Sequence, residues 1–154
     1  GSDEVAYGAK RGDGLSWRAW ALKEWPMDPS RLHQLPALGY DDYKRVIQRS
    51  WVHVYWTVPF ILSWSLMEAM ATGCCIVASA TPPVEEMITS GDGGQLVDFF
   101  DPDALAQQAN HLLQNQEQRQ KLGQCARQRI FEGGYDLQNA LKKQVELINQ
   151  VVRG

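Results

Sequence analysis

The sequence predicts an α/β fold: a partial Rossmann-like parallel sheet of about four strands, flanked by helices and followed by an all-helical C-terminal segment. Two continuous apolar runs, residues 51–57 and 75–80, are typical of parallel strands buried on both faces. Helical patterns alternate with these runs, and no strand pattern follows Asp101. Strands that alternate with helices favour a layered sheet with right-handed crossovers.

The remaining elements follow in order. A third strand is expected at 95–97, after the glycine-rich turn at 91–94, and a weaker candidate lies at Leu32–Leu35. Helical patterns before residue 100 cover 17–25, 41–49, 65–72 and 83–90, the last two ended by Gly73 and Gly91.

Three helices are expected in the C-terminal segment. The first begins at Pro102 after the capping residue Asp101, and the second spans 117–131. The third follows Asp136 and carries an apolar stripe, expected to pack against the sheet or a partner domain: Leu137, Leu141, Val145, Ile148 and Val152.

Composition narrows the class of protein. The 154 residues, 44% hydrophobic and 21% charged, fit one soluble globular domain spanning 1–154. A net charge of -3 with scattered Lys and Arg excludes nucleic acid as the main partner. The three cysteines lack ligand spacing, which favours reduced thiols in a cytoplasmic protein without a structural metal. No apolar run approaches the roughly 20 residues of a transmembrane segment.

The segment PFILSWSLMEAMATG, residues 59–73, joins a strand end to a helix start and presents Glu68 near the start of that helix. A carboxylate here can accept both hydroxyls of a ribose. Alternatively, Ser65 and Glu68 form a capping box, in which Glu68 bonds the Ser65 amide. Ser63 and Ser65 are either caps or donors to a phosphate, and free amides around Leu62–Trp64 would attract a diphosphate.

Other polar residues have simpler interpretations. The segment Thr81–Glu86 links a strand to a helix, where α/β proteins bind ligands. Glu85 and Glu86 point about 100° apart on a helix, so they favour the interpretation as helix-start charge over a paired acid site. His53 lies on a strand expected to be buried, which favours a hydrogen-bonded core histidine over a catalytic base. The loop around Lys10 and its glycines is either solvated or a phosphate loop.

The central residues LMEAMATGCCIVASATPPVEEMITSGDGGQLVDFFDPDALA resemble the donor-binding signature of retaining glycosyltransferases of family 4, which have the GT-B fold. The likeness runs from about Arg31 to the C-terminus. It implies a C-terminal, nucleotide-sugar-binding domain that transfers a sugar with retention. It also implies a nucleotide diphosphate sugar as substrate, no cofactor, no tightly held metal and an acceptor site on a separate N-terminal domain.

The resemblance also implies site residues. Glu68 matches the second glutamate of the motif, which holds the ribose, and Ile61–Ser65, including Leu62, Ser63 and Trp64, match the loop whose amides meet the diphosphate. Leu32–Leu35, including His33, fall where the family's backbone brackets the base. Glu86 matches the glutamate after the turn that begins at Thr81.

Departures from the family pattern matter equally. Phe60 occupies the position of the first glutamate of the motif, and a phenyl ring cannot replace that hydrogen-bond acceptor. The chain is expected to begin after the domain's first two strands, with residues 1–7 as loop, and so to lack their arginine and lysine and the acceptor domain. Either Leu32–Leu35 pairs with 51–57, or a second copy closes the open edge as a homodimer.

Two functions therefore stay open. One is the donor-binding part of a glycosyltransferase that acts with a partner domain, and no catalytic base can be assigned to it. The other is a catalytically inactive binding or self-association module. In a third, weaker alternative, an unrelated α/β ligand-binding domain, Glu68 is only part of a helix cap.

Overall fold

The computed structural model describes residues 9–153. The chain divides into two compact units, residues 1–44 and 45–154. Helix α2 (Tyr40–Arg49) runs across the boundary between them. The loop that the sequence predicts over residues 1–7 lies outside the described part of the chain.

Aromatic side chains gather in the described part of the first unit. Helix α1 (Trp17–Glu24) carries two indole rings in edge-to-face contact, with centroids 5.8 Å apart, from Trp17 and Trp20. The Arg11 guanidinium lies over both rings, at 5.0 and 4.5 Å from their centroids. Arg11 also pairs with Asp13. These contacts give Arg11, in the loop around Lys10, a packing role.

Leu32–Leu35 is not a strand, so that expectation is wrong. Only two of its four residues are apolar, and Pro36 follows directly. Proline lacks the N–H that a ladder needs, so the segment cannot be extended into a longer strand.

The second unit holds a four-stranded sheet in the order β1-β2-β4-β3, in which all paired strands are parallel. The strands are β1 (Val52–Tyr55), β2 (Cys75–Ser79), β3 (Thr89–Ser90) and β4 (Gly93–Val97). In the central register, Val54 of β1 lies opposite Val77 of β2. The predicted α/β class is confirmed, with Thr89–Ser90 as the fourth strand in place of Leu32–Leu35.

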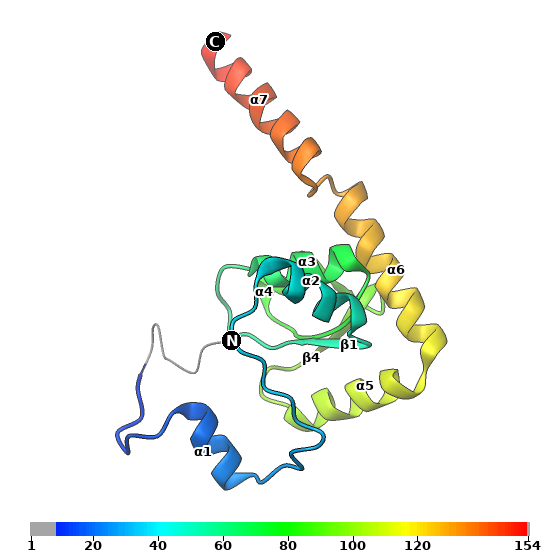
Figure 1. Ribbon diagram of the computed structural model, residues 1–154. Helices are drawn as coiled ribbons and strands as arrows, with labels where there is room; N and C mark the ends of the chain where they lie inside the picture. The colour runs from blue at the N-terminus through cyan, green and yellow to red at the C-terminus, as the bar shows by residue number, and fades with distance from the viewer. Residues whose placement is uncertain (1–8, 154) are drawn as a thin grey trace. The chain divides into compact units, whose positions relative to one another are not determined.

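Different helices cover the two faces of this sheet (Figure 1). The helices are α3 (Trp64–Thr72), α4 (Pro82–Glu85), α5 (Pro102–Gln114), α6 (Gln116–Glu132) and α7 (Leu137–Arg153). Cys75 and Val77 pack in one core with Leu112 of α5 and Leu122 of α6. Ile76 points to the opposite face, since side chains alternate along a strand, and α3 also contacts β2. Every residue of β2 is therefore buried.

Helix α3 ends where it meets α6. Gly73 follows α3 at φ 79°, a left-handed conformation that glycine adopts without strain. A side chain at Gly123 of α6 would overlap the Gly73 carbonyl oxygen, so glycine lets the two backbones approach closely. Arg127 of α6 donates from Nη1 to the Ala71 carbonyl at 2.9 Å. These contacts hold the C-terminal end of the helix that carries Glu68.

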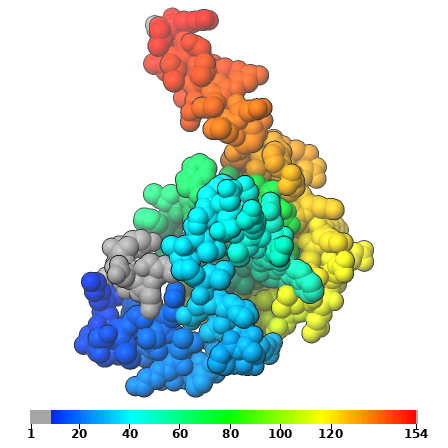
Figure 2. Space-filling model, in the orientation of Figure 1, coloured from blue at the N-terminus to red at the C-terminus, as the bar shows by residue number. Residues whose placement is uncertain are grey.

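Helix α7 has an apolar stripe but no buried residue. Its exposed large apolar residues are Leu137, Leu141, Val145, Leu147, Ile148, Val151 and Val152. In Figure 2 the visible face of this orange-to-red segment is not covered by other side chains. The expectation that the stripe packs against the sheet is wrong, and packing against a partner domain stays a prediction. Over residues 9–153, no helix combines the length and hydropathy that crossing a membrane requires.

Strand β1 forms an edge of the sheet in the described part of the chain, because it pairs with β2 alone. The expectation that Leu32–Leu35 pairs with this strand is therefore also wrong. Backbone groups along an open edge are available for pairing with another chain. Closure by a second copy stays a prediction.

Candidate functional site

The carboxyl ends of β1, β2 and β4 meet at one edge of the sheet, because the strands are parallel. Ser79, at the end of β2, donates from Oγ to the Thr57 carbonyl at 2.8 Å and accepts from the Thr57 amide at 3.1 Å. The Ala80 amide donates to the Val97 carbonyl at 2.7 Å. Hydrogen bonds therefore brace the three loops that leave this edge.

The chain enters α3 at Ser63. This residue is the N-cap, and its hydroxyl accepts from the Ser65 amide at 3.3 Å, so Trp64 is the first helical residue. The Ser63 amide donates to the hydroxyl of buried Tyr55 at 3.0 Å. Because Ser65 lies inside the helix, the capping box of Ser65 and Glu68 is wrong.

The amides expected to meet a diphosphate are partly engaged. Those of Ser63 and Ser65 donate to hydroxyl groups of the protein itself. Those of Leu62 and Trp64 have no hydrogen-bond partner among residues 9–153. Free N–H groups at the positive end of a helix attract anions. This helix end can therefore still receive an anion, with fewer free donors than the sequence predicts.

Glu68 lies in the second turn of α3 and is partly buried. No donor in the described part of the chain hydrogen-bonds to its carboxylate. Residues three apart on a helix share a face, so Glu68 lies on the same face of α3 as Ser65. Two carboxylate oxygens that are not used for capping can accept from two adjacent hydroxyl groups.

The start of α4 offers no comparable set of amides. Thr81 is its N-cap residue, only 2% exposed, and the Thr81 hydroxyl has no partner among the described residues. Pro82 and Pro83 occupy the first two helical positions and have no N–H. Thr81 therefore contributes an unsatisfied buried hydroxyl at the edge of the sheet where the carboxyl ends of the strands meet.

The other two predicted site residues lie elsewhere. Glu86 follows α4 and lines a cavity of about 500 Å³ with Asp92 and Arg129, whose charged groups are 3.7 Å apart. No hydrogen bond joins Glu86 to Glu68 in the described part of the chain. His33 belongs to the first unit, where it is exposed.

The loops at the carboxyl ends of the strands have no basic side chain. These loops are residues 56–63, 80–81 and 98–101, and none of them contains Lys or Arg. Asp98 accepts from the Phe100 amide at 2.7 Å, and Asp101 caps α5 by accepting from the Ala104 amide at 2.8 Å. Phe60, at the position of the family's first glutamate, is 67% exposed. Charge neutralisation within these loops can come only from backbone N–H dipoles.

Strand β1 carries a half-buried histidine, and no cluster of metal-binding side chains lies among the described residues. Burial of His53 lowers its pKa, which favours the neutral imidazole. Within residues 9–153, no group of three or more His, Cys, Asp or Glu side chains could hold a metal ion.

Sequence reasoning missed Tyr55 as a site residue. Its hydroxyl holds the Ser63 amide, and this contact fixes where α3 begins. Next to it, Trp56 stacks on Phe99 with centroids 5.6 Å apart, which joins the loops after β1 and β4. Aromatic residues at the end of a predicted strand are the signal that could have indicated such bracing.

Comparison with curated proteins gives two partial matches. The chain is 34% identical over 67 residues to N-acetyl-alpha-D-glucosaminyl L-malate synthase of Bacillus anthracis, which covers 44% of this chain and 18% of that protein. It is 35% identical over 81 residues to D-inositol 3-phosphate glycosyltransferase of Corynebacterium urealyticum, covering 53% of this chain and 19% of that protein. The matched regions span about a fifth of these relatives.

Solved structures share the fold at low identity. Sucrose-phosphate synthase from Thermosynechococcus elongatus superposes with a TM-score of 0.79 at 19% identity, over 87% of this chain and 33% of that chain. Anabaena HepE in complex with UDP-glucose gives 0.63 at 17% identity, over 69% and 29%. The C-terminal domain of the Francisella tularensis group 1 glycosyl transferase LpcC gives 0.65 at 17%, over 77% and 60%.

The family comparison covers the sheet and the helices around it. The model of the family described as "Glycosyl transferases group 1" matches residues 35–129, which is more than half of the chain. This range includes α3, β2 and the whole carboxyl edge of the sheet. The chain belongs to the group 1 family of glycosyl transferases.

Proposed function

We propose that this chain is the nucleotide-sugar-binding portion of a retaining glycosyl transferase. The observation that carries the proposal is Glu68, whose carboxylate is partly buried and engaged by no donor in the described part of the chain. The carboxylate follows a helix start with unpaired amides at Leu62 and Trp64. A ribose brings adjacent hydroxyls, and a diphosphate brings the anion that such amides attract.

In this proposal the two recognition elements lie on one helix. Glu68 accepts hydrogen bonds from the ribose, and the start of α3 receives the diphosphate of the leaving group. HepE, solved with UDP-glucose, has a similar fold, which supports a nucleotide sugar as the ligand class. The sugar, the base and the acceptor are not specified by the residues of this chain.

The acceptor site and the missing cations are proposed to come from outside this chain, from a partner or a further domain. The matched regions span only about a fifth of the curated relatives. Phe60 cannot accept a proton or a hydrogen bond, so we assign no catalytic residue to this chain. Transfer then requires the partner, whereas recognition of the ribose by Glu68 does not.

Isothermal titration calorimetry with UDP, GDP and ADP tests the binding role. Glu68→Ala removes two charge-assisted acceptors and should weaken the preferred nucleotide at least about tenfold. Glu146→Ala, on the exposed face of α7, is the matched control and should bind like the wild type. A folded chain that binds none of the three at millimolar concentration overturns the proposal, and equal binding by Glu68→Ala removes the ribose role.

The open edge of β1 favours a second candidate, a catalytically inactive self-association module. The edge has no strand partner within the described residues, and Val54 on β1 is exposed. A lysine at an edge strand opposes pairing with another edge. Analytical ultracentrifugation should then show a dimer for the wild type and a monomer for Val54→Lys. A monomeric wild type at high concentration excludes this candidate.

A further inference from the structure

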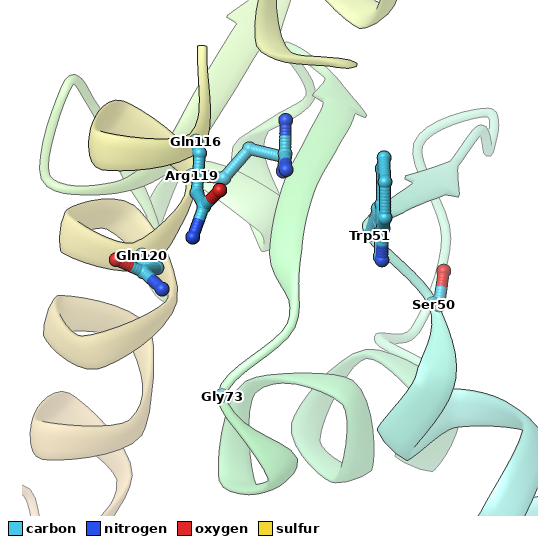
Figure 3. Close-up of a pocket in the computed structure, with 6 residues that line it drawn as sticks. All are labelled: Ser50, Trp51, Gly73, Gln116, Arg119 and Gln120. Atoms are coloured by element: carbon cyan, nitrogen blue, oxygen red, sulfur yellow. The ribbon is translucent and has the colours of Figure 1, made fainter. Parts of the chain in front are cut away.

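A second pocket lies at the opposite edge of the sheet, where the strands begin (Figure 3). Its volume is about 270 Å³, close to the lower limit of about 300 Å³ typical of small-molecule pockets. The residues that line it are Ser50, Trp51, Gly73, Gln116, Arg119 and Gln120. They come from the residues before β1 and β2 and from the first turns of α6, all within the second unit.

The cation of this pocket is fixed in place. Arg119 donates from Nη1 to the carbonyls of Leu112 and Leu113, both at 2.7 Å. These carbonyls belong to the last turn of α5, whose negative dipole end favours a cation. No described group bonds to Nε or Nη2 of Arg119, so both remain available as donors. A guanidinium with fixed position and free N–H groups suits a phosphate or carboxylate.

The indole ring of Trp51 lies beside the Arg119 guanidinium. The Arg119 guanidinium carbon lies 4.7 Å from the ring centroid of Trp51, and Figure 3 shows the two side chains directed toward each other. Trp51 is 65% exposed, so a large part of the indole surface is open to a ligand. An exposed indole provides apolar contact for a ring together with an N–H donor.

Two carboxamides complete the polar lining. Gln116 and Gln120 lie four residues apart on α6, hence on one face of the helix. Neither side-chain amide makes a hydrogen bond with the described residues, and each can both donate and accept. No Asp or Glu lines the pocket, so its only formal charge is the positive charge of Arg119.

We propose that this pocket binds a small anionic sugar, with the anion on Arg119, the ring against Trp51 and the hydroxyls on the two carboxamides. A monosaccharide that carries one phosphate matches the size and the donor set of the pocket. Since the pocket lies at the amino ends of the strands, this site is separate from the proposed nucleotide site at the carboxyl ends.

Calorimetry with glucose 6-phosphate, glucose and inorganic phosphate tests the assignment on the intact chain. Glucose 6-phosphate should bind saturably, and glucose and phosphate should each bind at least about tenfold more weakly, because each lacks one part of the recognised group. Trp51→Ala should weaken binding about tenfold, while Trp51→Phe, which keeps a ring, should retain most of it.

Gln120→Ala should weaken binding about fivefold through the loss of one hydrogen bond. Gln124→Ala, one turn further along α6 and outside the pocket, should bind like the wild type. The proposal is overturned if the folded chain shows no saturable binding at millimolar concentration, or if phosphate alone binds as tightly as the sugar phosphate. Competition by UDP, or loss of binding in Glu68→Ala, would also overturn it, since the probe would then occupy the carboxyl edge.

Discussion

The crossing of α3 and α6 gives the sharpest stability prediction, for Gly123→Ala. An alanine Cβ at this position would lie well inside van der Waals contact with the Gly73 carbonyl oxygen and 3.0 Å from its carbonyl carbon. The obstacle is backbone, so no side-chain rotation can relieve it. Overpacking of a core costs about 1–3 kcal/mol, and a backbone contact belongs at the upper end of this range. Alanine returns about 1 kcal/mol of helix propensity.

The expected net loss is therefore about 2 kcal/mol in the free energy of unfolding. Urea denaturation followed by circular dichroism at the helix band measures it, with an unchanged m-value as evidence of the same unfolding transition. Gln124→Ala, on the exposed side of the same helix, is the control and should change stability by no more than about 0.5 kcal/mol. A Gly123→Ala chain as stable as the wild type would show that the two helices do not require this close approach.

Three further predictions concern the loops and the core. Tyr55→Phe should lower the free energy of unfolding by about 1 kcal/mol, because it removes the acceptor of the Ser63 amide. UDP affinity, measured by calorimetry, should stay unchanged or rise, because the Ser63 amide becomes free to bind a phosphate. Weaker UDP binding would contradict this reasoning. Asp101→Ala should cost about 1 kcal/mol in urea denaturation through loss of the α5 cap, and an unchanged midpoint would show that the cap is dispensable. Burial raises the pKa of the Cys75 thiol to about 11, above its unfolded value, so stability should be fully present below about pH 9 and decline as pH rises toward 11; Cys75→Ala should flatten that decline in pH-dependent urea titrations.

The sequence supports prediction of the sheet because β2 is buried on both faces and β1, although only Tyr55 is fully buried, is also largely apolar. Such strands appear as continuous apolar runs, and 51–57 and 75–80 contain the observed strands. Strand β3 has no such signal. Its two residues, Thr89 and Ser90, are both exposed, and they pair with β4 across the glycine-rich turn between them. A pairing of this kind depends on turn geometry, which hydrophobic periodicity does not report.

The start of α3 shows a different limit. Ser63 and Ser65 are equally good N-caps by residue type, and the spacing of Ser65 to Glu68 favours the later one. The choice is made by Tyr55, which lies eight residues before Ser63 in the chain and bonds its amide across the loop. The pocket at the amino edge is similarly hidden, because Trp51 and Arg119 are brought together only by the packing of α6.

The charges at the carboxyl edge set a requirement on any diphosphate that binds there. A negative charge placed 4 Å from a carboxylate such as that of Glu68 costs about 4 kcal/mol at the effective dielectric near a protein surface, against about 1 kcal/mol in bulk water, and the cost falls with distance. A helix start contributes only about 0.3–1 kcal/mol toward an anion. Dipoles alone therefore do not offset a diphosphate held close to this carboxylate, and the edge loops contain no Lys or Arg. Tight binding of the whole nucleotide sugar must draw its cation from outside these loops, whereas recognition of the ribose by Glu68 has no such requirement.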